Sequence, residues 1–264
     1  MPKPSTCRGC PLEHSGEGWV PAEGGGKILI VGGAPGEAEA KSGKPFQGLS
    51  GWMLNRLLGR VGIDRSSLGI HNCLSCRPPR NYLSGAPWEY ASLAKCSPNL
   101  EATIERLQPK VIVAMGNTAL RQLTGKTGVG ALRGYPLIGP KGIWVVPTYH
   151  PSFLLPRAGQ KDTSKLQGAV MLGLLKAKQI AEEGFRYDAP ELILDPSPGA
   201  FEGYVTQALA SGAALSIDIE TPGKIAKDEE DLDEGGWNNS IIRIGFGYEE
   251  GRACSIPFDP PYRE

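Results

Sequence analysis

Six cysteines are the residues of this 264-residue chain whose spacing most directly suggests chemistry. Two pairs have the C-x-x-C spacing of metal ligands, Cys7 with Cys10 and Cys73 with Cys76, and Cys96 follows the second pair. The N-terminus has no apolar stretch typical of a signal peptide, so the cysteines favour metal binding or catalysis over disulfides. Four thiolates can hold a zinc ion or an iron–sulfur cluster, and spacing alone favours neither.

Other residues suited to chemistry lie at or near the ends of apolar runs. Asn72 ends one run, and its amide can both donate and accept hydrogen bonds. His150 ends another and can donate to developing negative charge. Asp218 and Glu220 have the i, i+2 spacing that places two side chains on one face of a strand. Two carboxylates so placed can ligate a divalent metal.

The elements that must position these residues alternate along the chain. Apolar runs predict buried strands, and 3.6-residue periodicity predicts helices between them. The expected strands are 27–33, 67–75, 110–116 and 142–150, and the main helices are 51–63, 88–107 and 164–184. This alternation predicts an α/β domain whose central, mainly parallel sheet is flanked by helices. Because sites of such sheets lie at the carboxyl ends of the strands, the loops 33–46, 72–81 and 150–157 are expected to meet at one rim.

A change in composition divides the chain. Residues 185–198 contain three prolines and mixed polarity, so we predict a domain over 1–185, a linker over 186–198 and a second segment over 199–264. That segment is expected to form a helix, a strand containing Asp218 and Glu220, and a hairpin.

Charge is balanced overall, with 28 basic and 28 acidic residues, but it is unevenly distributed. Residues 41–80 are predominantly basic and could face phosphates, whereas residues 217–235 are predominantly acidic. No apolar run reaches the length of a bilayer span, so we expect no membrane association and a cytoplasmic protein.

Several motifs together resemble the family 4 uracil-DNA glycosylases. The C-x-x-C near the N-terminus is followed by N-x-x-x-C-R-P-P-x-N from Asn72 and by E-x(6)-C ending at Cys96. Residues 32–39, 43–48, 111–119 and 150–152 resemble further motifs of that family, in its order, over about residues 5–180. The resemblance implies a uracil-DNA glycosylase fold that binds uracil-containing DNA. It also implies a [4Fe–4S] cluster on Cys7, Cys10, Cys76 and Cys96, with Cys73 a small buried strand residue.

The resemblance also implies a role for each pocket residue. Phe46 would stack on the extruded uracil, and Asn72 would read its O4 and N3 edge. Glu39 would occupy the space that the methyl group of thymine needs, the alternative being a solvent-exposed acid at a helix start. His150 would stabilise the negative charge that develops on uracil O2 when the N-glycosidic bond breaks.

Further positions follow from the same resemblance. Backbone N–H groups around Ala34 and Gly36 would position the base and the attacking water. An apolar tip after His150 would wedge into the gap left by the flipped base, and two arginines would contact phosphates. These expected DNA-binding residues are Phe153, Leu154, Arg157 and Arg77.

Gly33 departs from the family pattern, which usually has Glu at this position. The leading expectation is hydrolytic excision of uracil from DNA. Gly33 keeps open the alternative of a catalytically weak or inactive module that senses uracil in the template. A zinc-binding structural domain without uracil chemistry is a third possibility.

The C-terminal segment resembles a different family. Residues 215–223, Leu-Ser-Ile-Asp-Ile-Glu-Thr-Pro-Gly, resemble the first exonuclease motif of proofreading DNA polymerases. This implies part of a ribonuclease H-like 3′–5′ exonuclease domain in which Asp218 and Glu220 would bind Mg²⁺ or Mn²⁺ in a longer chain. The chain ends at Glu264, before the later carboxylate motifs, so we expect an incomplete segment without nuclease activity. The expected context is a monomer joined to a polymerase, in cis or in trans, in a bacterial or phage-infected cell.

Overall fold

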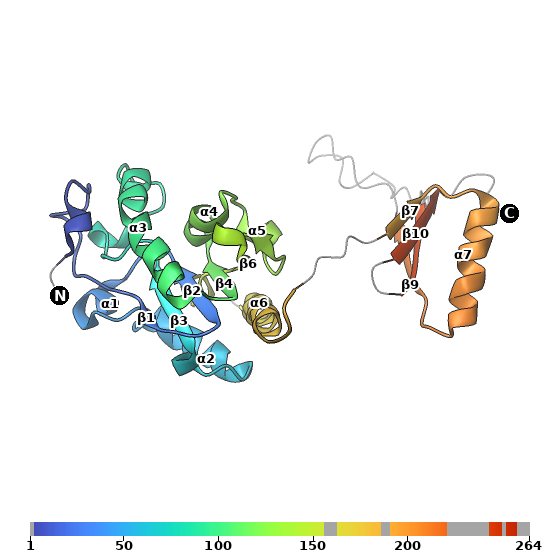
Figure 1. Cartoon of the computed structure of the whole chain (residues 1–264), viewed down its shortest axis with the longest axis horizontal. Helices are drawn as coiled ribbons and strands as arrows, with labels where there is room; N and C mark the ends of the chain where they lie inside the picture. Colours follow the sequence, from blue (N-terminus) through green and yellow to red (C-terminus); the bar gives the residue numbers. More distant parts are fainter. Residues whose placement is uncertain (1–2, 156–162, 186–190, 221–242, 250–251, 258–264) are drawn as a thin grey trace, which may run out of the picture. The chain divides into compact units, whose positions relative to one another are not determined.

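A computed structural model describes residues 3–155, 163–185, 191–220, 243–249 and 252–257 (Figure 1). The chain divides into two compact units, Met1–Phe185 and Arg186–Glu264, and each is considered by itself. Among the described residues, no helix combines the length and apolar character needed to cross a membrane.

The first unit is built on a six-stranded sheet in the order β1-β3-β2-β4-β6-β5. Its four central strands are parallel: β2 (Ile28–Gly32), β3 (Leu68–Asn72), β4 (Val111–Met115) and β6 (Trp144–Thr148). The two-residue strands β1 (Glu23–Gly24) and β5 (Leu137–Ile138) pair antiparallel at the edges. The expected mainly parallel sheet is therefore confirmed.

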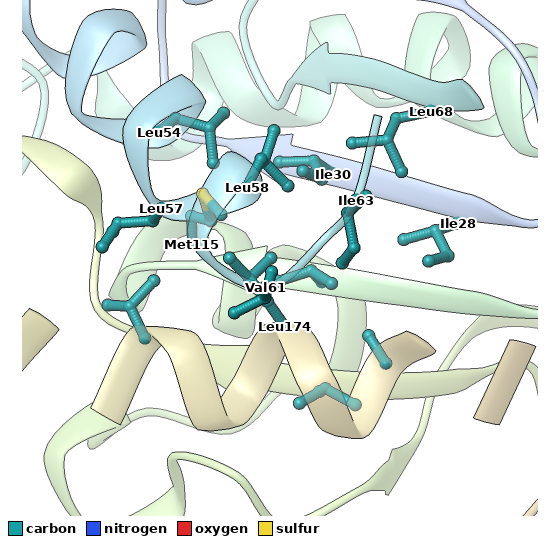
Figure 2. Packing of buried hydrophobic residues seen from close by; sticks show 14 of the residues in the cluster. Ile28, Ile30, Leu54, Leu57, Leu58, Val61, Ile63, Leu68, Met115 and Leu174 are labelled. Atoms are coloured by element: carbon teal, nitrogen blue, oxygen red, sulfur yellow. The ribbon is translucent and has the colours of Figure 1, made fainter. Parts of the chain in front are cut away.

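Helices cover both faces of this sheet. They are α1 (Glu37–Ser42), α2 (Leu49–Arg60), α3 (Glu89–Leu107), α4 (Asn117–Thr124), α5 (Val129–Leu132) and α6 (Ser164–Glu183). Successive strand residues point to opposite faces, so Ile28 and Ile30 pack with Leu57 of α2 and Leu174 of α6, as Figure 2 illustrates. On the other face, side chains from β2 and β4 pack with α3 and α4. Burial on both faces explains why these strands are continuously apolar.

Parallel pairing fixes where the loops gather. The register aligns Gly32 at the end of β2 with Asn72 at the end of β3, and Met115 at the end of β4 with Thr148 at the end of β6. The loops that follow these four strands therefore leave the sheet at one edge.

The second unit contains a four-stranded sheet in the order β7-β10-β9-β8. Its elements are β7 (Glu191–Leu194), α7 (Pro198–Ser211), β8 (Ser216–Glu220), β9 (Arg243–Glu249) and β10 (Arg252–Pro257). The strand β9 pairs antiparallel with β8 and β10, as expected for a strand followed by a hairpin. Residues 191–194 were expected within a linker, and that expectation is wrong. Their backbone groups pair in parallel with β10, and Ile193 packs against the buried Cys254 and Ile256.

Candidate functional site

A cavity of about 450 Å³ opens at the edge of the first sheet where the strands end. This volume lies in the range of small-molecule sites. It collects all the residues expected to bind a base, which lie in the segment after β2, at the end of β3 and after β6. These residues are Ala34, Gly36, Glu39, Phe46, Asn72 and His150.

Phe46 is buried against the cavity, with a backbone φ of 51° that bulky residues rarely adopt. The surrounding structure holds this conformation. Arg65 donates to the carbonyl oxygens of Pro45 (2.8 Å) and Phe46 (3.3 Å) and pairs with Glu23. A Cβ on Gly51 would lie 1.9 Å from the Phe46 carbonyl oxygen, so only glycine permits this approach. Sequence reasoning missed Arg65, whose partners are distant in the chain.

Asn72 lies at the end of β3 and is 3% exposed. Within the described part of the chain, no protein group forms a hydrogen bond with its side-chain amide. A Cβ on Gly32 would lie 2.4 Å from the Asn72 Oδ1 atom and 2.8 Å from the Phe46 ring. Gly32 thus allows the amide and the aromatic ring to approach the same strand end.

His150 has a defined tautomer. Its Nδ1 atom accepts the backbone N–H of Ser152 at 3.2 Å and lies 2.8 Å from the Ser152 hydroxyl. Because the backbone N–H can only donate, the imidazole proton belongs on Nε2. Desolvation lowers the pKa of His150 to about 4, although the nearby Glu39 opposes the shift. The imidazole is therefore neutral near pH 7 and can still donate one hydrogen bond.

Glu39 is 5% exposed, so the alternative of a solvent-exposed helix-start acid is wrong. One carboxylate oxygen accepts the N–H groups of Gln47 and Gly48, both at 2.7 Å, and the other accepts that of Gly36 at 2.9 Å. These bonds stabilise the carboxylate and tie together the two halves of the loop around Phe46.

Four cysteines line a second, smaller cavity: Cys7, Cys10, Cys76 and Cys96. The Cys10 and Cys96 sulfurs accept backbone N–H groups at 3.4 and 3.3 Å, as metal-bound thiolates commonly do. Burial raises the pKa of Cys76 to about 12, so a thiolate there requires the positive charge that a metal centre supplies. This donor set fits an iron–sulfur cluster. Among the described residues, no three His, Cys, Asp or Glu side chains form a site for a single metal ion.

Cys73 behaves differently from these four. It is 1% exposed, packs in the apolar core on the α3 side of the sheet and is not part of the cysteine-lined cavity. Burial raises the pKa of its thiol to about 12.

Comparison with known proteins assigns the first unit to a family. The profile of the uracil DNA glycosylase superfamily matches residues 21–170, which contain the whole first sheet and the residues that line the cavity. The chain belongs to this superfamily. A type-4 uracil-DNA glycosylase of Thermotoga maritima is 39% identical over 183 residues, covering 67% of this chain and 91% of that protein. One from Saccharolobus solfataricus is 35% identical over 198 residues, covering 69% and 87%.

A different relative extends into the second unit. A DNA polymerase of Bacillus phage SP01 is 26% identical over 248 residues, which cover 88% of this chain and 25% of that polymerase.

The four residues expected to contact DNA in this superfamily member differ in their surroundings. Phe153 is 41% exposed and stacks on Tyr149 with centroids 5.5 Å apart, so it can reach a ligand. Leu154 is fully buried in the core, and its placement at an exposed tip is wrong because the short helix Pro151–Leu154 turns it inward. Arg157 lies outside the described residues.

Arg77 was expected to contact phosphate, but its side chain is already engaged. It pairs with Glu17 at 2.6 Å and with Glu37 at 3.6 Å, and its Nε atom donates to Asn81 at 2.7 Å. Only 15% of the side chain is exposed. Arg77 therefore links the N-terminal segment to the loop after β3. The expectation that it contacts a phosphate is wrong, because its guanidinium group is already paired with protein side chains.

The expected metal ligands of the second unit lie on β8. Asp218 is exposed, and Glu220 ends the strand, but the Glu220 side chain lies outside what the structure describes.

Proposed function

We propose that the first unit is a uracil-DNA glycosylase that hydrolyses the N-glycosidic bond of uracil in DNA. The observation that carries this proposal is the neutral imidazole of His150 in a cavity shared with Phe46 and Asn72. This combination supplies a stacking surface, a group that reads a base edge and an uncharged donor.

Base excision requires that the nucleotide leave the helical stack and enter such a pocket. The uracil ring stacks on Phe46, while the Asn72 amide donates to O4 and accepts from N3–H. The free state of that amide supports this role, since a side chain already bonded to protein would lose a partner on binding. Glu39, fixed by three N–H donors, forms a rigid wall that disfavours a 5-methyl group.

His150 then acts where charge develops. As the bond to the sugar breaks, its electron pair moves to the uracil ring and places negative charge on O2. The neutral imidazole still has an N–H group at Nε2, and this group can donate a hydrogen bond to the charged oxygen. The backbone N–H group of Ala34 supports the position of the base, whereas that of Gly36 donates to the Glu39 carboxylate. Phe153 is the residue suited to fill the gap in the duplex.

We further propose that Cys7, Cys10, Cys76 and Cys96 hold a [4Fe–4S] cluster. When bound, the cluster supplies four metal–thiolate bonds that link the N-terminal segment, the loop after β3 and α3. Hydrolysis needs no electron transfer, so the contribution of these cysteines is structural. The alternative of zinc predicts a protein without visible absorbance.

Incubation of the purified protein with a uracil-containing oligonucleotide, followed by alkali, tests the enzymatic function. Cleavage at the uracil position, absent with thymine at the same position, is the expected result. The second candidate is a uracil-binding module without turnover, and Gly33 in the cavity wall favours it. Tight binding of the oligonucleotide without cleavage at excess protein would establish that candidate instead.

The second unit supports a link to DNA synthesis. The match to the phage polymerase runs across both units, so we propose that the glycosylase works joined to, or alongside, a polymerase in a bacterial or phage-infected cell. Asp218 and Glu220 on β8 are the proposed ligands of Mg²⁺ or Mn²⁺. Titration of Mn²⁺ into a longer polypeptide that carries the later exonuclease motifs, and into its Asp218→Asn variant, tests this, because only the former should bind the ion. A monomer by light scattering is expected.

A further inference from the structure

The titratable groups of the base-binding cavity are both engaged by other atoms. In the described lining they are Glu39 and His150. Three backbone N–H groups donate hydrogen bonds to the Glu39 carboxylate, and the Ser152 backbone N–H donates to the Nδ1 atom of His150. The described cavity therefore offers no free carboxylate that could accept a proton from the attacking water.

Gly33 leaves a space for a side chain in the cavity wall. A Cβ built on Gly33 would lie 3.6 Å from the Thr118 Cβ atom and 3.8 Å from its hydroxyl oxygen, which are ordinary contacts. The backbone of Gly33 is also outside the left-handed region, so nothing local requires glycine there. The missing side chain thus leaves a volume bounded by the Thr118 hydroxyl.

Thr118 differs from the polar groups beside it. The Asn117 side chain accepts the N–H groups of Gly128 and Val129, and Asn81 accepts from Arg77. Thr118 is the second residue of α4, lines the cavity and has no hydrogen bond from its hydroxyl to any described residue. A hydroxyl can accept from one water and donate to another group at the same time.

We propose that the Thr118 hydroxyl orients the attacking water in the space left by Gly33. This inference rests on the proposed glycosylase activity. The C1′–N1 bond breaks first, and its electron pair leaves with uracil. A lone pair of the water then forms the C1′–O bond, and the proton lost by the water goes to the uracil anion. Bond breaking that precedes water attack needs an oriented water but no strong base.

Substitution of Thr118 by valine tests this role. We expect Thr118→Val to lower the single-turnover rate about tenfold, as loss of one hydrogen bond at the reacting water implies, without change in DNA affinity. Thr118→Ser should retain the rate. Thr127→Val, the same change at an exposed position outside the cavity, is the matched control. Thr118→Ala replaces the valine variant if that variant does not fold.

A second measurement uses the empty position. Gly33→Glu places a carboxylate beside Thr118, and we expect a faster rate that falls as pH decreases through the pKa of the new group. The natural chain, measured at each pH alongside, should lack this additional loss, and its own rate should fall only near pH 4, where His150 becomes protonated. In the Gly33→Glu background, Thr118→Val should lose most of its effect, because the carboxylate then orients the water.

The outcomes separate the two proposals. Turnover by the natural chain with an unchanged Thr118→Val rate would overturn the role of Thr118 and leave the glycosylase function intact. A rate loss in Ser50→Ala but not in Thr118→Val would assign the role to Ser50, another hydroxyl of the cavity lining, and would overturn the proposal as well. A natural chain that binds uracil DNA but never cleaves it would overturn both.

Discussion

The Phe46 ring and the His150 imidazole lie 5.6 Å apart, centroid to centroid, with their planes tilted by 31°. The two residues are far apart in the sequence, and they meet because β2 and β6 are both neighbours of β4 in the parallel sheet. A stacking surface and an uncharged hydrogen-bond donor therefore line the same base-binding cavity.

His150→Asn shortens the side chain and removes the Nε2–H donor. We expect the single-turnover rate on uracil DNA to fall about 10²–10³-fold, the range for loss of one donor to developing charge. Binding of the uncleaved oligonucleotide should change much less. His14→Asn, at an exposed histidine outside the cavity, is the control. A rate close to that of the natural protein would remove His150 from the mechanism.

Gly32→Ala should disturb both base-binding side chains at once. The new methyl group would lie 2.4 Å from the Asn72 Oδ1 atom and 2.8 Å from the Phe46 ring, so one or both must move. We expect at least about a tenfold loss of kcat/KM, because a small displacement of the Asn72 amide or the Phe46 ring lowers the rate of reaction of the bound base. Gly59→Ala, where no atom lies within 4 Å, should keep full activity. Equal activity of the two variants would contradict the packing described.

Stability should decrease as the pH falls from about 6.5 to 4, partly through His71. Burial, followed by the charge of Arg106, lowers the pKa of His71 to about 4, so the unfolded chain binds more protons in this window. The loss is roughly 3 kcal/mol over the whole window. Urea unfolding at several pH values gives the free energy of unfolding as a function of pH. This free energy should change less steeply with pH for His71→Leu than for the natural chain. An unchanged slope would mean that His71 titrates normally in the folded protein.

Cys96→Ser and Cys73→Ser should behave differently despite both residues being buried. Cys96→Ser removes a proposed cluster ligand, so we expect lost iron, lost visible absorbance and a lower melting temperature. Cys73→Ser should keep the iron and the spectrum, with only the cost of a hydroxyl in the core. Iron analysis after purification without oxygen gives the answer. Loss of iron in the Cys73 variant would reassign the ligand set.

Phe153→Ala should affect duplex DNA more than single strands. A wedge matters only where a base pair must be opened, so we expect about a tenfold loss of kcat/KM on duplex substrate and little change on a single strand. Tyr135→Ala removes another exposed aromatic ring and is the control. Equal losses on both substrates would indicate a general binding contact.

Local patterns in the sequence determined the strands of the first unit and the candidate residues of its cavity. The apolar runs predicted the parallel strands, because strands buried on both faces have continuous apolar sequence. The motifs also predicted roles for Asn72, Phe46 and His150, and the structure brings all three side chains to one cavity. Cys73 was separated from the other cysteines by resemblance, and the structure places it in the core.

Only the tertiary structure decided which side chains are free to act. Leu154 is buried, Arg77 is held by two carboxylates, and Glu39 is enclosed by three N–H groups from residues on both sides of Phe46. Arg65 supports Phe46 from a distant segment, and residues 191–194 become a strand by pairing with β10. These outcomes depend on partners far apart in the chain. Residue type and spacing set what a side chain can do, but long-range packing sets which of its atoms remain unpaired.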